Sequence, residues 1–98
     1  MIVIRNVFQL QFGRAKEALE LLKEGAMFAN NEADGEVRIL TDVTGPFYTL
    51  VLEISHQNLA AYEAAMKKMS ESKEWGAWYR KFAPLVVSGH REIFTVVQ

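Results

Sequence analysis

The chain opens with alternating apolar and polar positions over residues 2–12. A period of two is typical of a β-strand with one buried face. One alternate set is apolar and includes Ile4, Phe8 and Leu10, with Asn6 as its polar exception. The other set mixes the two kinds of residue: Val3, Arg5, Val7, Gln9 and Gln11. We expect a strand over 2–12 with the first set facing a core.

Gly13 ends this alternation, and a helical period follows over residues 15–29. The apolar positions recur every three or four residues, as on one face of an amphipathic helix: Ala15, Ala18, Leu19, Leu22, Ala26 and Ala29. Gly25 lies inside this helix, where glycine costs about 1 kcal/mol relative to alanine. We therefore expect a bend or close packing at Gly25. The turn-forming residues at 30–35 predict the end of the helix.

Two short strands are predicted at 36–42 and 47–55, joined by a turn at 44–46. Tyr48 shares one face of the second strand with the apolar even-numbered positions. Ser55 is a candidate N-cap for a second helix. The inward stripe of that helix is expected to be apolar: Leu59, Tyr62, Met66 and Met69.

An aromatic stripe follows at the spacing i, i+3, i+4 and i+7: Trp75, Trp78, Tyr79 and Phe82. Pro84 predicts that this helical segment ends at the preceding residue. A last strand is expected over 85–97, with Gly89 as a bulge. The resulting order, βαββαβ, predicts an α+β, ferredoxin-like fold over residues 1–98 as one domain, with helices on one face of a four-stranded antiparallel sheet.

The opposite face of this sheet would then lack a cover. It carries Val3, Val7, Phe47 and Val51 among polar residues, which makes it too apolar for free exposure over a whole sheet. A two-fold homodimer with the two sheets face to face would cover it. The alternative is a monomer with a few exposed valines.

Composition narrows the classes of function. The 98 residues carry 11 basic and 12 acidic side chains, which gives no electrostatic footprint for nucleic acid. No cysteine is present, so disulfides, thiol catalysis and thiolate metal sites are excluded. No apolar run approaches the ~20 residues that span a bilayer, and the N-terminus lacks the pattern of a signal peptide. We expect a cytoplasmic protein with no metal site, no cofactor, no nucleic-acid partner and no membrane partner.

Four stretches of the chain resemble the NIPSNAP family, and together they cover nearly its whole length: MIVIR at 1–5, GPFYTLVLE at 45–53, SKEWGAWY at 72–79 and PLVVSGHREI at 84–93. The resemblance implies membership of the dimeric α/β-barrel superfamily and hence the sheet-to-sheet homodimer. Bacterial members of the family have no settled biochemical activity.

The same superfamily includes cofactor-independent antibiotic-biosynthesis monooxygenases and haem-degrading monooxygenases. The resemblance implies a ligand cleft between the helices and the covered face of the sheet. Asn6 matches an asparagine on the first strand of the haem-degrading enzymes. Their tryptophan falls near Met66 or Met69 here, and their haem-ligating histidine falls near Tyr79. The resemblance therefore gives no support for a haem site.

Asn6 is the first candidate for a functional residue, because a buried amide without hydrogen-bond partners costs about 1–3 kcal/mol. It either binds a ligand or bonds local backbone or a buried water. The aromatic stripe either fills the core or walls a pocket. The candidate ligand-binding residues are Asn6, Tyr48, Tyr62, Trp75, Trp78 and Tyr79.

The catalytic candidates are Asn6, Tyr79 and His90. His90 could act as a general base only if it points inward, which the expected bulge leaves open. His56 is expected to be exposed at the start of the second helix. Three functions remain open: a homodimer that binds a small apolar or aromatic molecule, a cofactor-independent monooxygenase, or an interaction module without ligand.

Overall fold

The computed structural model describes all residues, 1–98. The elements follow in the order β1 (Ile2–Leu10), α1 (Ala15–Glu32), β2 (Val37–Thr41), β3 (Thr49–His56), α2 (Leu59–Ser70), α3 (Lys73–Phe82), a 3-10 turn η1 (Ala83–Leu85) and β4 (Val86–Thr95). The strands form one antiparallel sheet in the order β2-β3-β1-β4. The predicted ferredoxin-like α+β fold is therefore confirmed.

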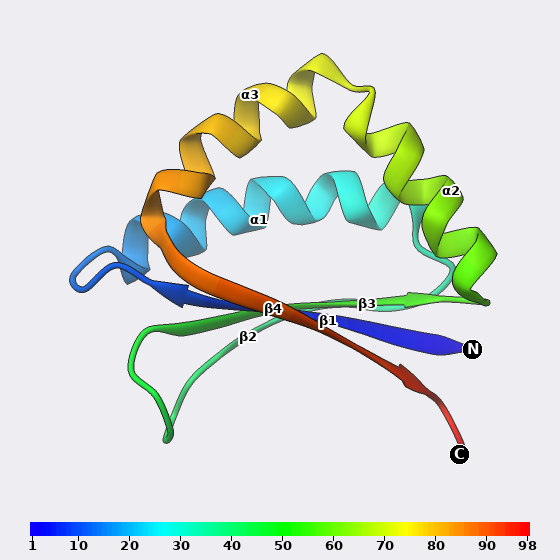
Figure 1. Cartoon of the computed structure of the whole chain (residues 1–98), viewed down its shortest axis with the longest axis horizontal. Helices are drawn as coiled ribbons and strands as arrows, with labels where there is room; N and C mark the ends of the chain where they lie inside the picture. The colour runs from blue at the N-terminus through cyan, green and yellow to red at the C-terminus, as the bar shows by residue number, and fades with distance from the viewer.

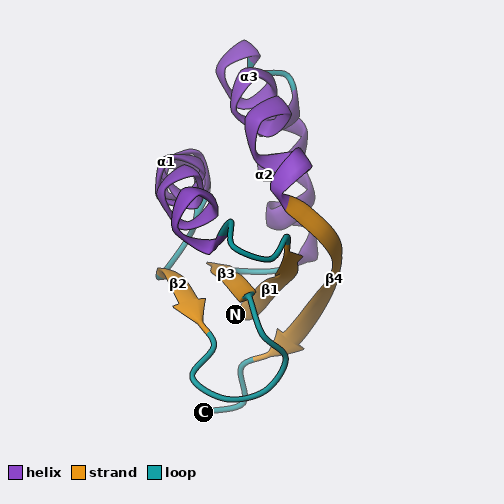
Figure 2. Ribbon diagram, turned by 90° about the vertical axis from the view of Figure 1, so that its left-hand side faces the viewer, coloured by secondary structure: helices purple, strands orange, loops and turns teal.

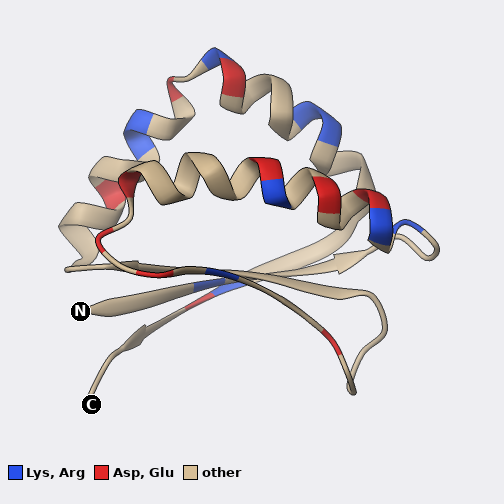
Figure 3. Ribbon diagram, turned by 180° about the vertical axis from the view of Figure 1, so that it is seen from behind, with Lys and Arg blue, Asp and Glu red and all other residues tan.

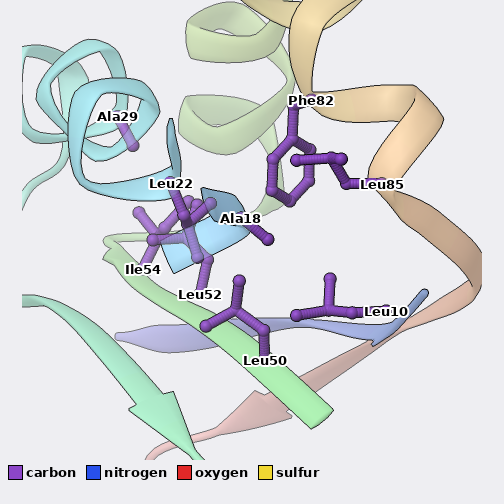
Figure 4. Close-up of a cluster of buried hydrophobic side chains, with 9 residues drawn as sticks. All are labelled: Leu10, Ala18, Leu22, Ala29, Leu50, Leu52, Ile54, Phe82 and Leu85. Atoms are coloured by element: carbon purple, nitrogen blue, oxygen red, sulfur yellow. The ribbon is translucent and has the colours of Figure 1, made fainter. Parts of the chain in front are cut away.

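All helices lie on one side of the sheet (Figures 1 and 2). α1 runs along the sheet, while α2 and α3 form an arch that returns the chain to the edge strand β4 (Figure 1). The core fills the space between these layers, where nine buried side chains point toward one another (Figure 4): Leu10, Ala18, Leu22, Ala29, Leu50, Leu52, Ile54, Phe82 and Leu85. Burying such side chains is the main driving force for this two-layer arrangement.

The opposite face of the sheet, called here the open face, has no helix over it (Figure 2). More of the charged residues lie on the helices than on the strands (Figure 3). Leu40 and Phe94 remain 37% and 48% exposed on the strands. The register of Leu40 with Val51 places both on the open face.

Several predicted boundaries shift. β1 ends at Leu10 rather than at residue 12, since the chain turns at Gly13, which has a φ of 80°. α1 continues through the expected stop at residues 30–31 to Glu32. β3 begins at Thr49 because Tyr48 has a φ of 59°, outside the range of a strand.

The expected cap at Ser55 is wrong. β3 continues to His56, and the side chain of Asn58 caps α2 by accepting a hydrogen bond from the Ala61 amide at 2.9 Å. As a result His56 ends a strand and is only 3% exposed, which also corrects its expected exposure. Leu59 does not point inward; it is half exposed, and Tyr62 and Ala65 form the buried side of α2.

The expected bulge at Gly89 is also wrong. Gly89 pairs in register with Phe8, and the register of β1 with β4 shifts between Gln9 and Leu10 instead. A Cβ at position 89 would lie 3.1 Å from the Val7 carbonyl oxygen. Close approach of the two strands, rather than a bulge, thus explains the glycine.

Candidate functional site

A cavity of about 350 Å³ lies between the sheet and the helices. Its sheet side is formed by β1, β3 and β4, through residues such as Asn6, Leu52 and Gly89. Met66 and Met69 of α2 border it, and the aromatic residues of α3 form another wall. We call this space the cleft.

The aromatic wall of the cleft is an ordered stack. The rings of Trp75 and Tyr79 are stacked with centroids 5.1 Å apart, and those of Trp78 and Phe82 with centroids 5.0 Å apart. Phe82 in turn meets Phe8 of β1 edge to face at 5.1 Å. Such pairs contribute about 0.5–1.5 kcal/mol each beyond the area they bury. The stack therefore connects α3 to the sheet and holds the wall in place.

Trp78 is fixed against α1. Its Nε1 donates a hydrogen bond of 2.5 Å to the backbone carbonyl of Leu21. A Cβ at Gly25 would come within 2.5 Å of Cε2 and 2.9 Å of Cη2 of the indole. The glycine leaves the room that the indole occupies, so the close packing predicted at this position is confirmed.

The start of α3 is set by Ser72. Its hydroxyl accepts a hydrogen bond from the Trp75 amide at 3.2 Å and donates to Glu74 at 3.0 Å. The hydrogen bonds of Glu74 to its own backbone and to Ser72 lower the pKa of its carboxyl. This cap starts α3 at Lys73, directly after the break that separates it from α2.

Asn6 is paired across the sheet with Arg91 of β4. The Arg91 Nε donates to Asn6 Oδ1 at 2.6 Å, and the guanidinium carbon lies 5.8 Å from the centroid of the Tyr62 ring. The side-chain oxygen of Asn6 is thus bound by Arg91 rather than by local backbone. Arg91 borders the cleft and was missed in the sequence, because its place opposite Asn6 depends on the pairing register of the first and last strands.

Four of the six candidate ligand-binding residues meet at the cleft: Asn6, Trp75, Trp78 and Tyr79. Tyr62 lies next to it, beneath Arg91, and is 7% exposed. Its hydroxyl is buried without a hydrogen-bond partner. Burial raises the pKa of this hydroxyl, and the positive charge of Arg91 partly opposes the rise.

Tyr48 does not reach the cleft, which corrects its expected place. It lines a separate, more open cavity of about 600 Å³ beside Leu10, α1 and the β2–β3 connection. Its ring packs against Phe12 at 4.7 Å. Its φ of 59° is typical of turns rather than of strands. Tyr48 therefore does not follow the alternation of faces along β3 from which its place was predicted.

The two histidines do not supply a base to the cleft. The backbone of His90 borders the cleft, but His90 pairs with Val7 of β1, so its side chain lies on the open face. There its Nε2 lies 3.8 Å from Glu92. The Nδ1 of the buried His56 lies 3.4 Å from Asp34 and has no hydrogen-bond partner. Of the catalytic candidates, Asn6 and Tyr79 therefore present their side chains to the cleft.

An ionic cluster occupies the middle of the open face. Glu53 is 7% exposed and accepts hydrogen bonds from Arg5 at 3.0 and 3.1 Å and from Arg38. The hydrogen bond from Arg38 is the main reason that the pKa of Glu53 is lowered, against the opposing effect of burial. Glu53 is thus engaged in structural ion pairs rather than in the cleft.

The structure contains no group of three or more histidine, cysteine or acidic side chains placed to hold a metal ion. None of its helices is both long and apolar enough to cross a membrane.

The sequence matches no model of a protein family and no curated protein. The fold does match solved structures. An uncharacterized NIPSNAP domain protein from Burkholderia xenovorans has a TM-score of 0.90 at 15% identity, covering 99% of this chain and 95% of that one. A NIPSNAP family protein from Agrobacterium tumefaciens has a TM-score of 0.90 at 18% identity, with 98% and 85% covered.

SnoaB, a cofactor-independent oxygenase from Streptomyces nogalater, has a TM-score of 0.76 at 14% identity, covering 99% of this chain and 93% of that one. At these identities the likeness concerns the fold. The resemblance seen in the sequence is confirmed at that level: the chain has the fold shared by NIPSNAP proteins and monooxygenases of the antibiotic-biosynthesis type.

Proposed function

We propose that this protein binds a small aromatic or apolar molecule in the cleft, and that it does so as a homodimer joined through the open face. The observation that carries the binding proposal is the cleft itself: an aromatic and methionine-lined cavity that meets one polar pair, Asn6 and Arg91. Binding pockets combine a mostly apolar lining with a few oriented polar groups in this way.

The dimensions of the cleft support this proposal. Its volume of about 350 Å³ lies in the lower part of the range for small-molecule sites, about 300–1,000 Å³. The flat faces of the Trp75–Tyr79 stack suit a planar ring. Met66 and Met69 supply flexible, polarizable side chains that adapt to different shapes. A planar molecule of two or three fused rings fits this lining best.

The homodimer rests on the open face. Leu40, Val51 and Phe94 lie beside the Glu53 ion pairs, and no element of the chain covers them. The charges at the centre are already paired within the chain, so a second copy would bury apolar area without leaving an unpaired carboxylate. Two-fold symmetry would place the same patch on both sides of the interface.

The binding proposal is tested by filling the cleft. Met66→Trp places a large ring in the cavity, and Met27→Trp makes the same change on the outer side of α1, where Met27 is 68% exposed. Calorimetric titration with naphthalene and anthracene derivatives should show binding to the wild type and to Met27→Trp. We expect at least a tenfold loss in Met66→Trp, and equal affinities for the two variants would show that ligands bind elsewhere.

A second function, cofactor-independent oxygenation, is favoured by the orientation of Asn6. Its Oδ1 is bound by Arg91, so its amide NH2 is left to donate to an oxyanion in the cleft. In such a reaction a substrate CH2 loses a proton, its carbanion reacts with O2, one oxygen atom becomes the new carbonyl and the other leaves as water. Tyr79 is the remaining candidate base at the cleft.

Oxygen uptake with an anthrone substrate tests this second function. Uptake that persists with a chelator and is lost in Asn6→Ala would establish it, and absence of uptake with bound anthrone would exclude it. The third alternative, an interaction module without ligand, expects protein side chains to fill the space beside Asn6. A cavity at that place speaks against it.

A further inference from the structure

Arg91 is a cation without a carboxylate partner at the border of an aromatic cleft. Arg5, Arg14 and Arg38 each form ion pairs with glutamates, whereas Arg91 forms none. No acidic residue lines the cleft. The neighbouring Glu92 does not neutralise it, because Glu92 lies on the open face with Arg5 and His90.

The guanidinium of Arg91 is held in place by neutral groups. Its Nε is bound to Asn6 Oδ1 at 2.6 Å, and the Tyr62 ring lies 5.8 Å from its central carbon. Asn6 is opposite Arg91 in the register of β1 and β4, so two neighbouring strands fix the pair. Neither neighbour is a carboxylate, and the hydrogen bond to Asn6 uses only one of the five N–H donors of the arginine.

A guanidinium with free donors matches the two oxygens of a carboxylate, which it binds through two parallel hydrogen bonds. The cleft beside it offers stacked indole and phenol rings but no counter-ion. The two features lie next to each other, so one molecule can use both.

We infer that the ligand of the cleft is an aromatic carboxylate, with its ring against Trp75, Trp78 and Tyr79 and its carboxylate on Arg91. This inference rests on the proposed function and adds the class of ligand. Asn6 and Tyr62 act as positioning residues, since they hold the guanidinium rather than the acid.

Paired probes of the same shape test the inference. Calorimetric titration compares 2-naphthoate with 2-naphthamide, and 9-anthroate with its amide, on the wild type and on Arg91→Met. Arg80→Met is the matched control, because Arg80 also forms no ion pair but lies on α3 outside the cleft. Arg91→Lys keeps the charge and serves as the conservative variant.

We expect the wild type and Arg80→Met to bind the acids about tenfold more tightly than the amides, the ratio expected for one partly exposed charged contact. Arg91→Met should lose this preference while still binding the amides, and Arg91→Lys should keep part of it. Acids and amides that bind the wild type equally, or a preference that persists in Arg91→Met, would overturn the inference alone. If none of the four compounds binds the wild type below about 1 mM, the inference and the proposed function both fall.

Discussion

Gly25→Ala tests the packing on which the cleft depends. In an exposed helix this change stabilises by about 1 kcal/mol, since alanine has the better helix propensity. Here the new methyl group would lie 2.5 Å from Cε2 of Trp78 and 2.9 Å from Cη2. Cβ atoms in real structures essentially never lie within 3.0 Å of such a neighbouring atom, so the indole or α1 must move.

The expected effect follows from three contributions. Overpacking of this kind costs about 1–3 kcal/mol. Displacement of the indole also weakens its hydrogen bond to the Leu21 carbonyl, at about 1 kcal/mol. The gain in helix propensity offsets about 1 kcal/mol. We therefore expect a net destabilisation of about 1–3 kcal/mol, and a Tm lower by about 4–8 °C for each kcal/mol.

Urea unfolding followed by tryptophan fluorescence measures this change. A double-mutant cycle with Trp78→Leu isolates the contact, because leucine leaves room for the methyl group. In the Trp78→Leu background, Gly25→Ala should become stabilising. A Gly25→Ala variant that is more stable than the wild type would refute the close contact between α1 and Trp78.

Three further predictions concern the sheet and α2. The pKa of Glu53 is lowered in the fold, so its charge stabilises the protein above its unfolded pKa and this contribution is lost as pH falls through the folded pKa. Glu53→Gln should therefore cost about 1 kcal/mol at pH 7 and less as the pH falls through the folded pKa of Glu53, as measured by urea unfolding, and a cost independent of pH would contradict the ion-pair assignment. Sedimentation should give the wild type twice the mass of one chain, with Leu40→Glu reduced to one chain and Met27→Glu unchanged; a monomeric wild type would exclude the dimer. Tyr62→Phe removes a buried hydroxyl without a partner, so thermal unfolding should show unchanged stability or a gain of up to about 1 kcal/mol, whereas a clear loss would reveal a hidden partner.

The fold could be predicted from the sequence because it depends on the periodicity of apolar residues along the chain. The alternation in β1 and the helical spacing in α1 persist over enough residues to define the buried faces. Apart from the bulge predicted at Gly89, the errors in the predicted boundaries lie where the chain reverses direction. Ser55 and Asn58 are both good capping residues, and only the length of the β1–β3 pairing, from Ile2–His56 to Gln9–Thr49, decides between them.

The residues of the cleft could be predicted from the sequence only in part. Asn6 could be found because it interrupts the apolar alternation of β1, and the aromatic residues of α3 because they recur at helical spacing. Arg91 could not, since its role depends on pairing with a strand 85 residues away. Tyr48 was misplaced because a positive φ at one residue cancels the face that alternation assigns to it.

The four methionines allow the most direct test of the cleft. Met66 and Met69 line it, whereas Met1 and Met27 are 52% and 68% exposed elsewhere. Titration of protein labelled with 13C at the methionine methyl groups should show ring-current shifts when 2-naphthoate is added. If the cleft binds the aromatic ring, the Met66 and Met69 signals move together and the Met1 and Met27 signals stay in place. Shifts confined to Met1 or Met27, or no shifts at saturating ligand, would contradict binding in the cleft.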